Sequence, residues 1–266
     1  MFKFTPILTL VLVLCSSPSA FAHEFWIEPE DYRLAPGDNV VAHLRNGEFF
    51  KGSSLAYFER RTARFEAVQG GTTFPITPRM GDVPAVDMVA TEPGLLVLVH
   101  ETEGATLKYT EWEKFQKFAD HKDFPDIEMR HTARDIARTG FTEEYRRFAK
   151  SLLAIGPGDG RDLVTAMETE FVALANPYTD TLDGGLPVQL LYQGAPRADA
   201  QIEVFEKSPA GGVEITLMRS DQDGRAMIPV KPGHSYLIDA VVLREINDDP
   251  NAVWETLWAA LTFAVP

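Results

Sequence analysis

The clearest structural signal in this sequence is the stretch LPVQLLYQGAPRADAQIEVFE, residues 186–206. Apolar residues recur at every second position in its two halves, and the turn-forming residues Gly194, Pro196 and Asp199 stand between them. A period of two is typical of a β-strand with one buried face. The stretch therefore predicts two strands, over 186–192 and 200–206, joined by a turn.

Four further segments of the same kind follow before the C-terminus, over 213–218, 225–230, 235–243 and 257–265. Six short strands separated by Gly, Pro and Asp turns are typical of an immunoglobulin-like sandwich. We therefore predict an immunoglobulin-like β-domain over 186–266.

Short strands also fill the first part of the chain. Residues 39–44 follow a Pro-Gly-Asp turn, and residues 94–100 form a continuous apolar run, GLLVLVH. We predict an N-terminal β-sandwich over 23–109 and a mainly β protein overall.

A helical insertion is predicted between the two β-domains, over 110–160, where the hydrophobic period changes from two to 3.6. The first helix places Trp112, Phe115 and Phe118 on one face, and Thr110 with Glu113 would form a capping box at its start. A second helix is predicted over 126–139 and a third over 142–153, where apolar residues recur at i, i+3, i+4, i+7 and i+8. A linker over 161–185, with a strand-like segment at 168–175, leads to the C-terminal domain.

Residues 1–22 have the layout of a secretory signal peptide. Lys3 supplies the positive charge, an apolar run follows over 6–15, and Ala20-Phe21-Ala22 is a small-x-small cleavage pattern. The apolar run is about half the length needed to cross a bilayer, so we expect release into the periplasm and no membrane insertion.

The charge and the cysteine content exclude several function classes. Residues 1–22 hold one of the 25 Lys and Arg residues and none of the 39 Asp and Glu residues, so the remaining 24 bases and 39 acids carry a net charge of −15. Such a surface repels nucleic acid and anionic lipid. Cys15, the only cysteine, leaves with the signal peptide, so the secreted chain has no thiol for disulfides or zinc sites.

Cleavage after Ala22 would make His23 the first residue. Its α-amino group and its ring Nδ1 could then chelate a metal, and a second imidazole would complete a histidine brace. Nitrogen donors of this kind favour copper or nickel. We predict a metal site at His23 with His100 or His121. His131 is expected to be a surface residue, His43 to be solvated or to line a cavity, and His234 to lie in a turn or at the start of a strand. No hydrolase, nucleotide-binding or calcium-loop motif is complete, so no catalytic residue is predicted.

Five segments resemble a known family: residues 22–29 (AHEFWIEP), 121–124 (HKDF), 145–153 (YRRFAKSLL), 173–178 (ALANPY) and 258–263 (WAALTF). Together they are similar to the DUF4198 family, a group of exported bacterial proteins sometimes labelled as nickel uptake or periplasmic cobalt/nickel transport components. Residues 221–226 also resemble a turn of carboxypeptidase-regulatory-like immunoglobulin domains. The resemblance implies export, a β-rich fold and a connection with metal transport, and it supplies no catalytic residues.

These observations lead to one main hypothesis and two alternatives. The main one is a periplasmic protein that binds copper or nickel and acts in metal uptake or delivery, with a membrane transporter or an envelope protein as its partner. The first alternative is an interaction module that binds an envelope protein or a glycan without a metal. The second is an oxidative enzyme with a copper brace.

Overall fold

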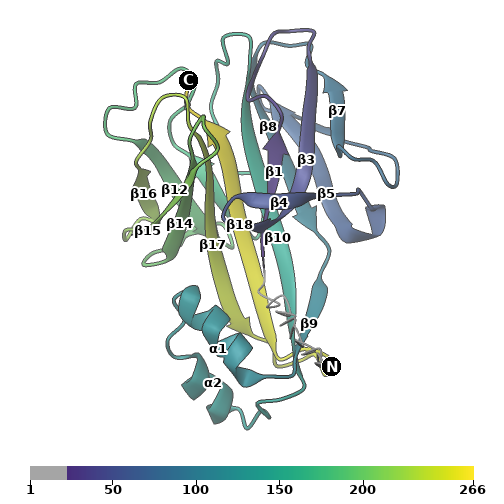
Figure 1. The fold of residues 1–266 in the computed structure, drawn as a ribbon, viewed down its shortest axis with the longest axis vertical. Helices are drawn as coiled ribbons and strands as arrows, with labels where there is room; N and C mark the ends of the chain where they lie inside the picture. Colours follow the sequence, from purple (N-terminus) through teal and green to yellow (C-terminus); the bar gives the residue numbers. More distant parts are fainter. Residues whose placement is uncertain (1–22) are drawn as a thin grey trace, which may run out of the picture.

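The computed structural model describes residues 23–266, so the predicted signal peptide lies outside the described residues. The predicted mainly β fold of the sandwich class is confirmed (Figure 1). A central sheet has the strand order β15-β14-β17-β18-β10-β8-β5-β6, and β2 and β9 also pair with β10. Its strands are β2 (Arg33–Leu34), β5 (Thr62–Gln69), β6 (Thr72–Pro75), β8 (Gly94–Thr102), β9 (Ala105–Tyr109), β10 (Phe141–Ile155), β14 (Gln201–Lys207), β15 (Val213–Arg219), β17 (Ser235–Glu245) and β18 (Trp254–Ala264).

Two smaller sheets complete the β-structure of the described residues. The first contains β1 (Glu24–Pro29), β3 (Asn39–Glu48), β4 (Lys51–Leu55) and β7 (Val86–Val89). The second contains β11 (Thr169–Ala173), β12 (Leu186–Tyr192), β13 (Ala195–Pro196) and β16 (Arg225–Ile228). The predicted segments 23–109 and 186–266 both supply strands to the central sheet, so hydrogen bonding runs across the predicted domain boundary.

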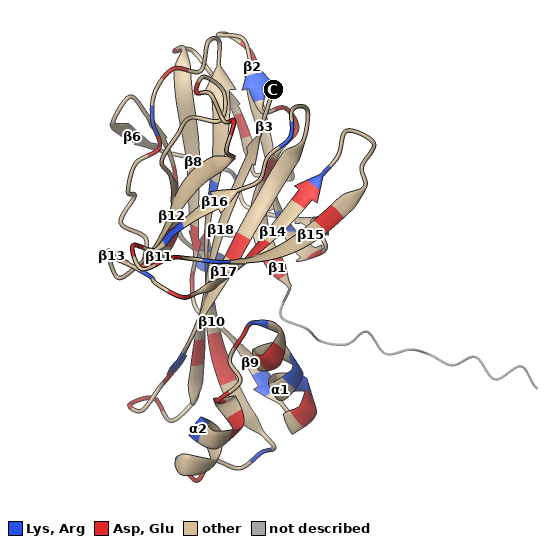
Figure 2. Ribbon diagram, turned by 90° about the vertical axis from the view of Figure 1, so that its left-hand side faces the viewer, with Lys and Arg blue, Asp and Glu red and all other residues tan. Residues whose placement is uncertain are grey.

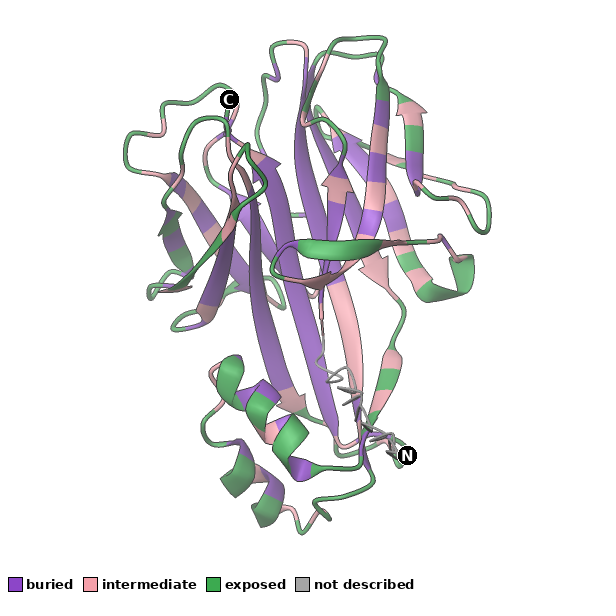
Figure 3. Ribbon diagram, in the orientation of Figure 1, coloured by how far each residue is buried: buried purple, intermediate pink, exposed green. Residues whose placement is uncertain are grey.

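Each small sheet covers one face of the central sheet. On β8, Leu95, Val97 and Val99 belong to the apolar core shared with β11 and β12, whereas Leu96 and Leu98 belong to the core shared with β1 and β3. Successive side chains of a strand point to opposite faces, so a strand buried on both faces becomes a continuous apolar run. This explains the apolar sequence at 94–99, and Figure 3 shows the long strands β10, β17 and β18 buried over most of their length.

The third predicted helix is wrong, because residues 141–155 form the central strand β10. Phe148 and Leu152 face one core, and Ala149 and Leu153 face the other. Apolar residues on both faces of a strand produce the i, i+3, i+4 spacing that is otherwise typical of a helix. Tertiary packing therefore decides the conformation of this segment.

The other two predicted helices are present as α1 (Trp112–His121) and α2 (Ile127–Ala133), with a short 3₁₀ helix η1 (Glu59–Arg61) elsewhere. The predicted apolar face of α1 is buried. The predicted capping box is wrong, because Glu111 is the N-cap residue and makes no side-chain capping hydrogen bond. The second helix ends six residues earlier than predicted, at Ala133. None of the described helices has the length and apolar character needed to span a membrane.

Both helices pack against the far ends of the long strands β10, β17 and β18, away from the small sheets (Figures 1 and 2). His131 of α2 lies in this contact, and its predicted surface position is wrong. It is fully buried beside Trp112, Phe141 and Trp254, and its Nδ1 accepts a hydrogen bond of 3.0 Å from Trp254 Nε1. Burial lowers the pKa of His131, so its ring is neutral near pH 7.

Candidate functional site

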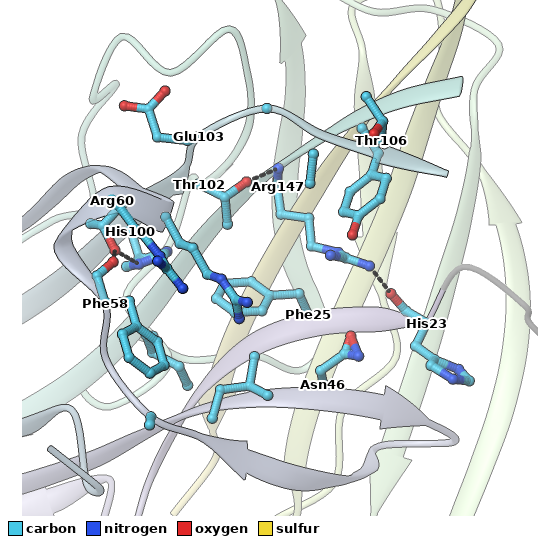
Figure 4. Close-up of a pocket in the computed structure, with 18 of the residues that line it drawn as sticks. His23, Phe25, Asn46, Phe58, Arg60, His100, Thr102, Glu103, Thr106 and Arg147 are labelled. Atoms are coloured by element: carbon cyan, nitrogen blue, oxygen red, sulfur yellow. Dashed lines mark hydrogen bonds between the residues drawn. The ribbon is translucent and has the colours of Figure 1, made fainter. Parts of the chain in front are cut away.

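The three histidines predicted as metal ligands lie in different surroundings. His23 immediately precedes β1, His100 lies within β8, and His121 is the last residue of α1. His23 and His100 both line one pocket, whereas His121 lines another. Figure 4 shows the ring of His23 turned out of the first pocket, away from His100.

His23 is held in place by neighbours from two strands. Its carbonyl oxygen accepts a hydrogen bond of 3.0 Å from Arg147 Nη2 of β10 (Figure 4). Its ring Nδ1 lies 3.1 Å from Glu48 Oε1, at the end of β3 where the chain turns into β4. Nδ1 is shielded from solvent but makes no hydrogen bond with a described residue, so the short contact with Glu48 lacks hydrogen-bond geometry.

His100 is a buried, neutral histidine. Its ring packs between those of Phe25 and Phe65, at centroid distances of 5.3 and 4.9 Å, and its Nε2 lies 3.2 Å from the hydroxyl of Thr62. Burial lowers the pKa of His100 to about 3. His100 therefore lies in a largely apolar environment within β8.

His121 lies beside a charge cluster that we call the Lys122 cluster: Lys122, Glu24, Glu203 and Asp239. The Nε2 atom of His121 is 3.2 Å from Glu203 Oε1, which raises the pKa of the imidazole. Lys122 Nζ lies 3.3 Å from Glu24 Oε1, 3.0 Å from Glu203 Oε1 and 3.1 Å from Asp239 Oδ1. All four members of the cluster are buried.

The three carboxylates of the Lys122 cluster are close enough together to bind a metal ion, since one oxygen of each lies within 4.8 Å of the others. The ammonium group of Lys122 is within ion-pair distance of all three, so the protein supplies its own cation there. It also lies 4.8 Å from the ring centroid of Trp258. Burial and the neighbouring carboxylates raise the pKa of Asp239 to about 7, and burial raises the pKa of Glu24.

The raised pKa of Asp239 predicts a pH effect on stability. Between pH 4 and pH 7 the folded state keeps a proton on Asp239 that the unfolded state has released, so this residue contributes less stability as the pH rises through that range. We expect the free energy of unfolding of the native protein, relative to the variant Asp239→Asn, to fall by about 2 kcal/mol between pH 5 and pH 8. Urea unfolding of both proteins at the two pH values measures this difference.

Asp87→Asn, at an exposed position in β7, provides the control, because its stability curve should run parallel to that of the native protein. A parallel curve for Asp239→Asn as well would show that Asp239 has an ordinary pKa in the folded protein.

Glu48 and the carboxylates of the Lys122 cluster were not predicted from the sequence as candidate site residues. One signal for the cluster was present, because Asp239 interrupts the otherwise apolar run YLIDAVVL at 236–243. A charged residue on an inward face of a strand needs a partner of opposite charge. The sequence shows no such signal for Glu48, whose position beside His23 follows from the register that pairs β1 with β3.

Comparison with models of known protein families identifies one family that matches this chain. A family model described as "Domain of unknown function (DUF4198)" matches residues 20–244. No curated protein matches the chain.

Two solved structures are similar to the chain at low identity. One is described as "Crystal structure of tetra-tandem repeat in extending region of large adhesion protein", with 10% identity and a TM-score of 0.22 over 91% of this chain. The chain spans about half of that structure, 49%. The other is described as "D0-D1 domain of Intimin", with 11% identity and a TM-score of 0.20, over 90% of this chain and 97% of that one. At these TM-scores neither likeness supports an argument about function.

Proposed function

The chain belongs to the DUF4198 family, and we propose that it is a periplasmic protein that binds copper or nickel at His23 and acts in metal uptake or delivery. The proposal includes export and cleavage after Ala22, because only a first residue offers both its α-amino group and its ring to one ion. The amino group and Nδ1 would close a chelate ring, and both are nitrogen donors of the kind that copper and nickel prefer.

The observation that carries the proposal is the contact between His23 and Glu48. Two ligand atoms that each lie about 2.0–2.2 Å from one ion, at a right angle, are roughly 2.8–3.1 Å apart. His23 Nδ1 and Glu48 Oε1 are 3.1 Å apart, without a hydrogen bond between them. Both side chains are about two-fifths exposed, but Nδ1 itself is shielded, so an ion from solvent reaches it only after the ring of His23 rotates.

The second imidazole that this proposal favours is His121 rather than His100. Glu48 and His121 line the same pocket of about 230 Å³, together with Glu24. The ring of His100 is buried among phenylalanine rings in the other pocket. We therefore propose His23 and Glu48 as the primary ligands, with His121 as the neighbouring donor.

Calorimetric titration with Cu²⁺ and Ni²⁺ tests the site. A chain that begins at His23 is expected to bind one ion, and an otherwise identical chain that begins at Ala22 at least ten times more weakly, because its amino group is too far from Nδ1 to close the chelate ring. Glu48→Gln should also weaken binding, whereas Glu113→Gln, at an exposed position on α1, should not. Equal affinities of the chains beginning at Ala22 and His23 would contradict the amino-terminal site, and an unchanged affinity of Glu48→Gln would contradict Glu48 as a ligand.

One observation favours the alternative of an interaction module without a metal. The strand β15 lies at the edge of the central sheet and exposes Ile215 and Leu217, and both line the second pocket with the exposed Phe49. An unpaired strand edge beside exposed apolar side chains is a common docking surface for another chain. If the chains that begin at Ala22 and at His23 bound metal with equal affinity, the interaction module would become the better proposal.

A further inference from the structure

The pocket lined by His23 and His100, about 490 Å³ in volume, has a lining that the metal site does not explain (Figure 4). We call it the arginine pocket, after Arg60, Arg61 and Arg147, which contribute to its walls. It lies where the start of β1, the end of β4, η1, the turn from β8 to β9 and the strand β10 meet. Its volume is within the usual range for pockets that bind small molecules.

The charge of the arginine pocket is opposite to that of the whole protein. The chain has a net charge of −14, yet three guanidinium groups line this pocket beside one carboxylate, that of the exposed Glu103. Arg60 and Arg61 make no ion pair with any described carboxylate, so their charge is not neutralised within the described part of the chain. A concave site with excess positive charge attracts anions.

Arg60 and Arg61 are also held in an orientation suited to binding. Their guanidinium groups lie 5.6 and 5.4 Å from the ring centroid of Phe58, which is itself part of the wall. An aromatic ring under a guanidinium group restricts its motion and leaves its N–H groups free to form paired hydrogen bonds with a carboxylate or a phosphate.

Arg147 forms the opposite side of the pocket, and one of its donors is unused. Its Nη2 donates to His23, and its guanidinium lies 4.5 Å from the ring centroid of Tyr145, but its buried Nε has no hydrogen-bond partner among the described residues. Buried polar groups without a partner are rare in folded proteins, because each costs about 1–3 kcal/mol. The unpaired Nε means that the described residues compensate the charge of Arg147 only in part, so this guanidinium adds to the positive potential of the pocket.

The remaining wall mixes polar and apolar side chains. Phe25, Leu44 and Leu107 supply apolar surface, and Figure 4 shows Phe25 near the centre of the pocket. The lining therefore pairs guanidinium groups, which fix an anionic head, with apolar side chains, which cover an apolar body.

We propose that the arginine pocket binds a small organic anion that carries a carboxylate or phosphate group on an apolar, ring-sized body. The pocket shares one residue, His23, with the proposed metal site: His23 is part of the wall, and its carbonyl oxygen accepts a hydrogen bond from Arg147. Glu48 and His121 do not line this pocket, so the proposed anion binding is an additional function that requires no metal.

Calorimetric titration of the chain beginning at His23, in buffer containing EDTA, tests the proposal with benzoate, phenyl phosphate, benzamide and inorganic phosphate as probes. Benzoate or phenyl phosphate should bind saturably, and the tighter of the two identifies the head group. Benzamide lacks the charge and inorganic phosphate lacks the ring, so each should bind at least ten times more weakly. Equal binding of benzoate and benzamide, or no binding of either charged ring compound at millimolar concentration, would overturn the proposal.

The double variant Arg60→Gln/Arg61→Gln removes two exposed charges of the pocket and should weaken binding of the preferred anion at least ten-fold. The control Arg79→Gln/Lys231→Gln removes two exposed charges elsewhere and should leave binding unchanged. An equal loss of anion affinity in both double variants would show that the anion is attracted by the overall charge of the protein alone, and would overturn the proposed anion site. Glu48→Gln should retain anion binding, and Arg60→Gln/Arg61→Gln should retain Cu²⁺ binding, so failure of one site can be distinguished from failure of the other.

Discussion

Replacing Lys122 with Met is expected to lower the free energy of unfolding by about 3–5 kcal/mol at pH 8. The methylene part of the side chain is kept, but Glu24, Glu203 and Asp239 lose the ammonium group that lies within 3.3 Å of each. Buried carboxylates without a counter-charge repel one another and are poorly solvated. Urea unfolding followed by tryptophan fluorescence measures the loss.

The pH dependence of this loss separates charge from packing. Without Lys122 the carboxylates take up protons more readily in the folded state, so the difference between Lys122→Met and the native protein should shrink at pH 5. Lys114→Met is the control, because Lys114 lies on α1, the helix that Lys122 follows, and its ion pair among the described residues is the exposed one with Glu111, which should contribute less than about 1 kcal/mol. A loss at Lys122 that is as small as the loss at Lys114, or one that does not change with pH, would contradict this account of the cluster.

The sequence predicted the strands of the second half of the chain to within a few residues. Strand β12 has the predicted bounds, and β14, β15 and β17 begin within one residue of their predicted starts. Polar turn residues interrupt the apolar pattern at every connection between these strands. Such residues mark the ends of the strands and can be recognised in a single sequence.

The same reasoning failed at β10 for a physical reason. Its neighbours β8 and β18 pair with it on both edges, and apolar cores cover both its faces. A strand in that position needs no polar face, so the alternation that identifies a strand is lost. Nothing local distinguishes such a segment from a buried helix; the distinction depends on partners more than a hundred residues away at β18.

The candidate sites were only partly predictable for a related reason. His23 could be identified because its ability to chelate a metal depends only on its being the first residue after the proposed cleavage site. Glu48 could not, because its contact with His23 requires the hairpin turn after β3 and the antiparallel pairing of β1 with β3. The Lys122 cluster likewise assembles residues from four segments of the chain. Glu203 and Asp239 lie on β14 and β17 of the central sheet, Glu24 lies on β1 of a small sheet and Lys122 follows α1, so only the complete fold brings them together.

Replacing Trp254 with Ala is expected to lower the free energy of unfolding by about 3–5 kcal/mol and to loosen both helices. Trp254 is fully buried, contacts the ring of Phe115 of α1 at a centroid distance of 5.9 Å, and donates its indole N–H to His131 of α2. The guanidinium groups of Arg130 and Arg134 both lie 5.0 Å from its ring centroid. One side chain of β18 thus contacts both helices, so its removal should increase amide hydrogen exchange in α1 and α2 far more than in β12.

The variant Trp254→Phe distinguishes packing from hydrogen bonding at this position. Phenylalanine keeps an aromatic ring against Phe115 but leaves Nδ1 of the buried His131 without its donor, which should cost about 1–3 kcal/mol. If the loss comes mainly from packing, Trp254→Phe will be clearly more stable than Trp254→Ala and will keep the helices protected from exchange. Equal losses and equal exchange in the two variants would instead mean that the hydrogen bond to His131 attaches the helices, because it is the one contact that both substitutions remove.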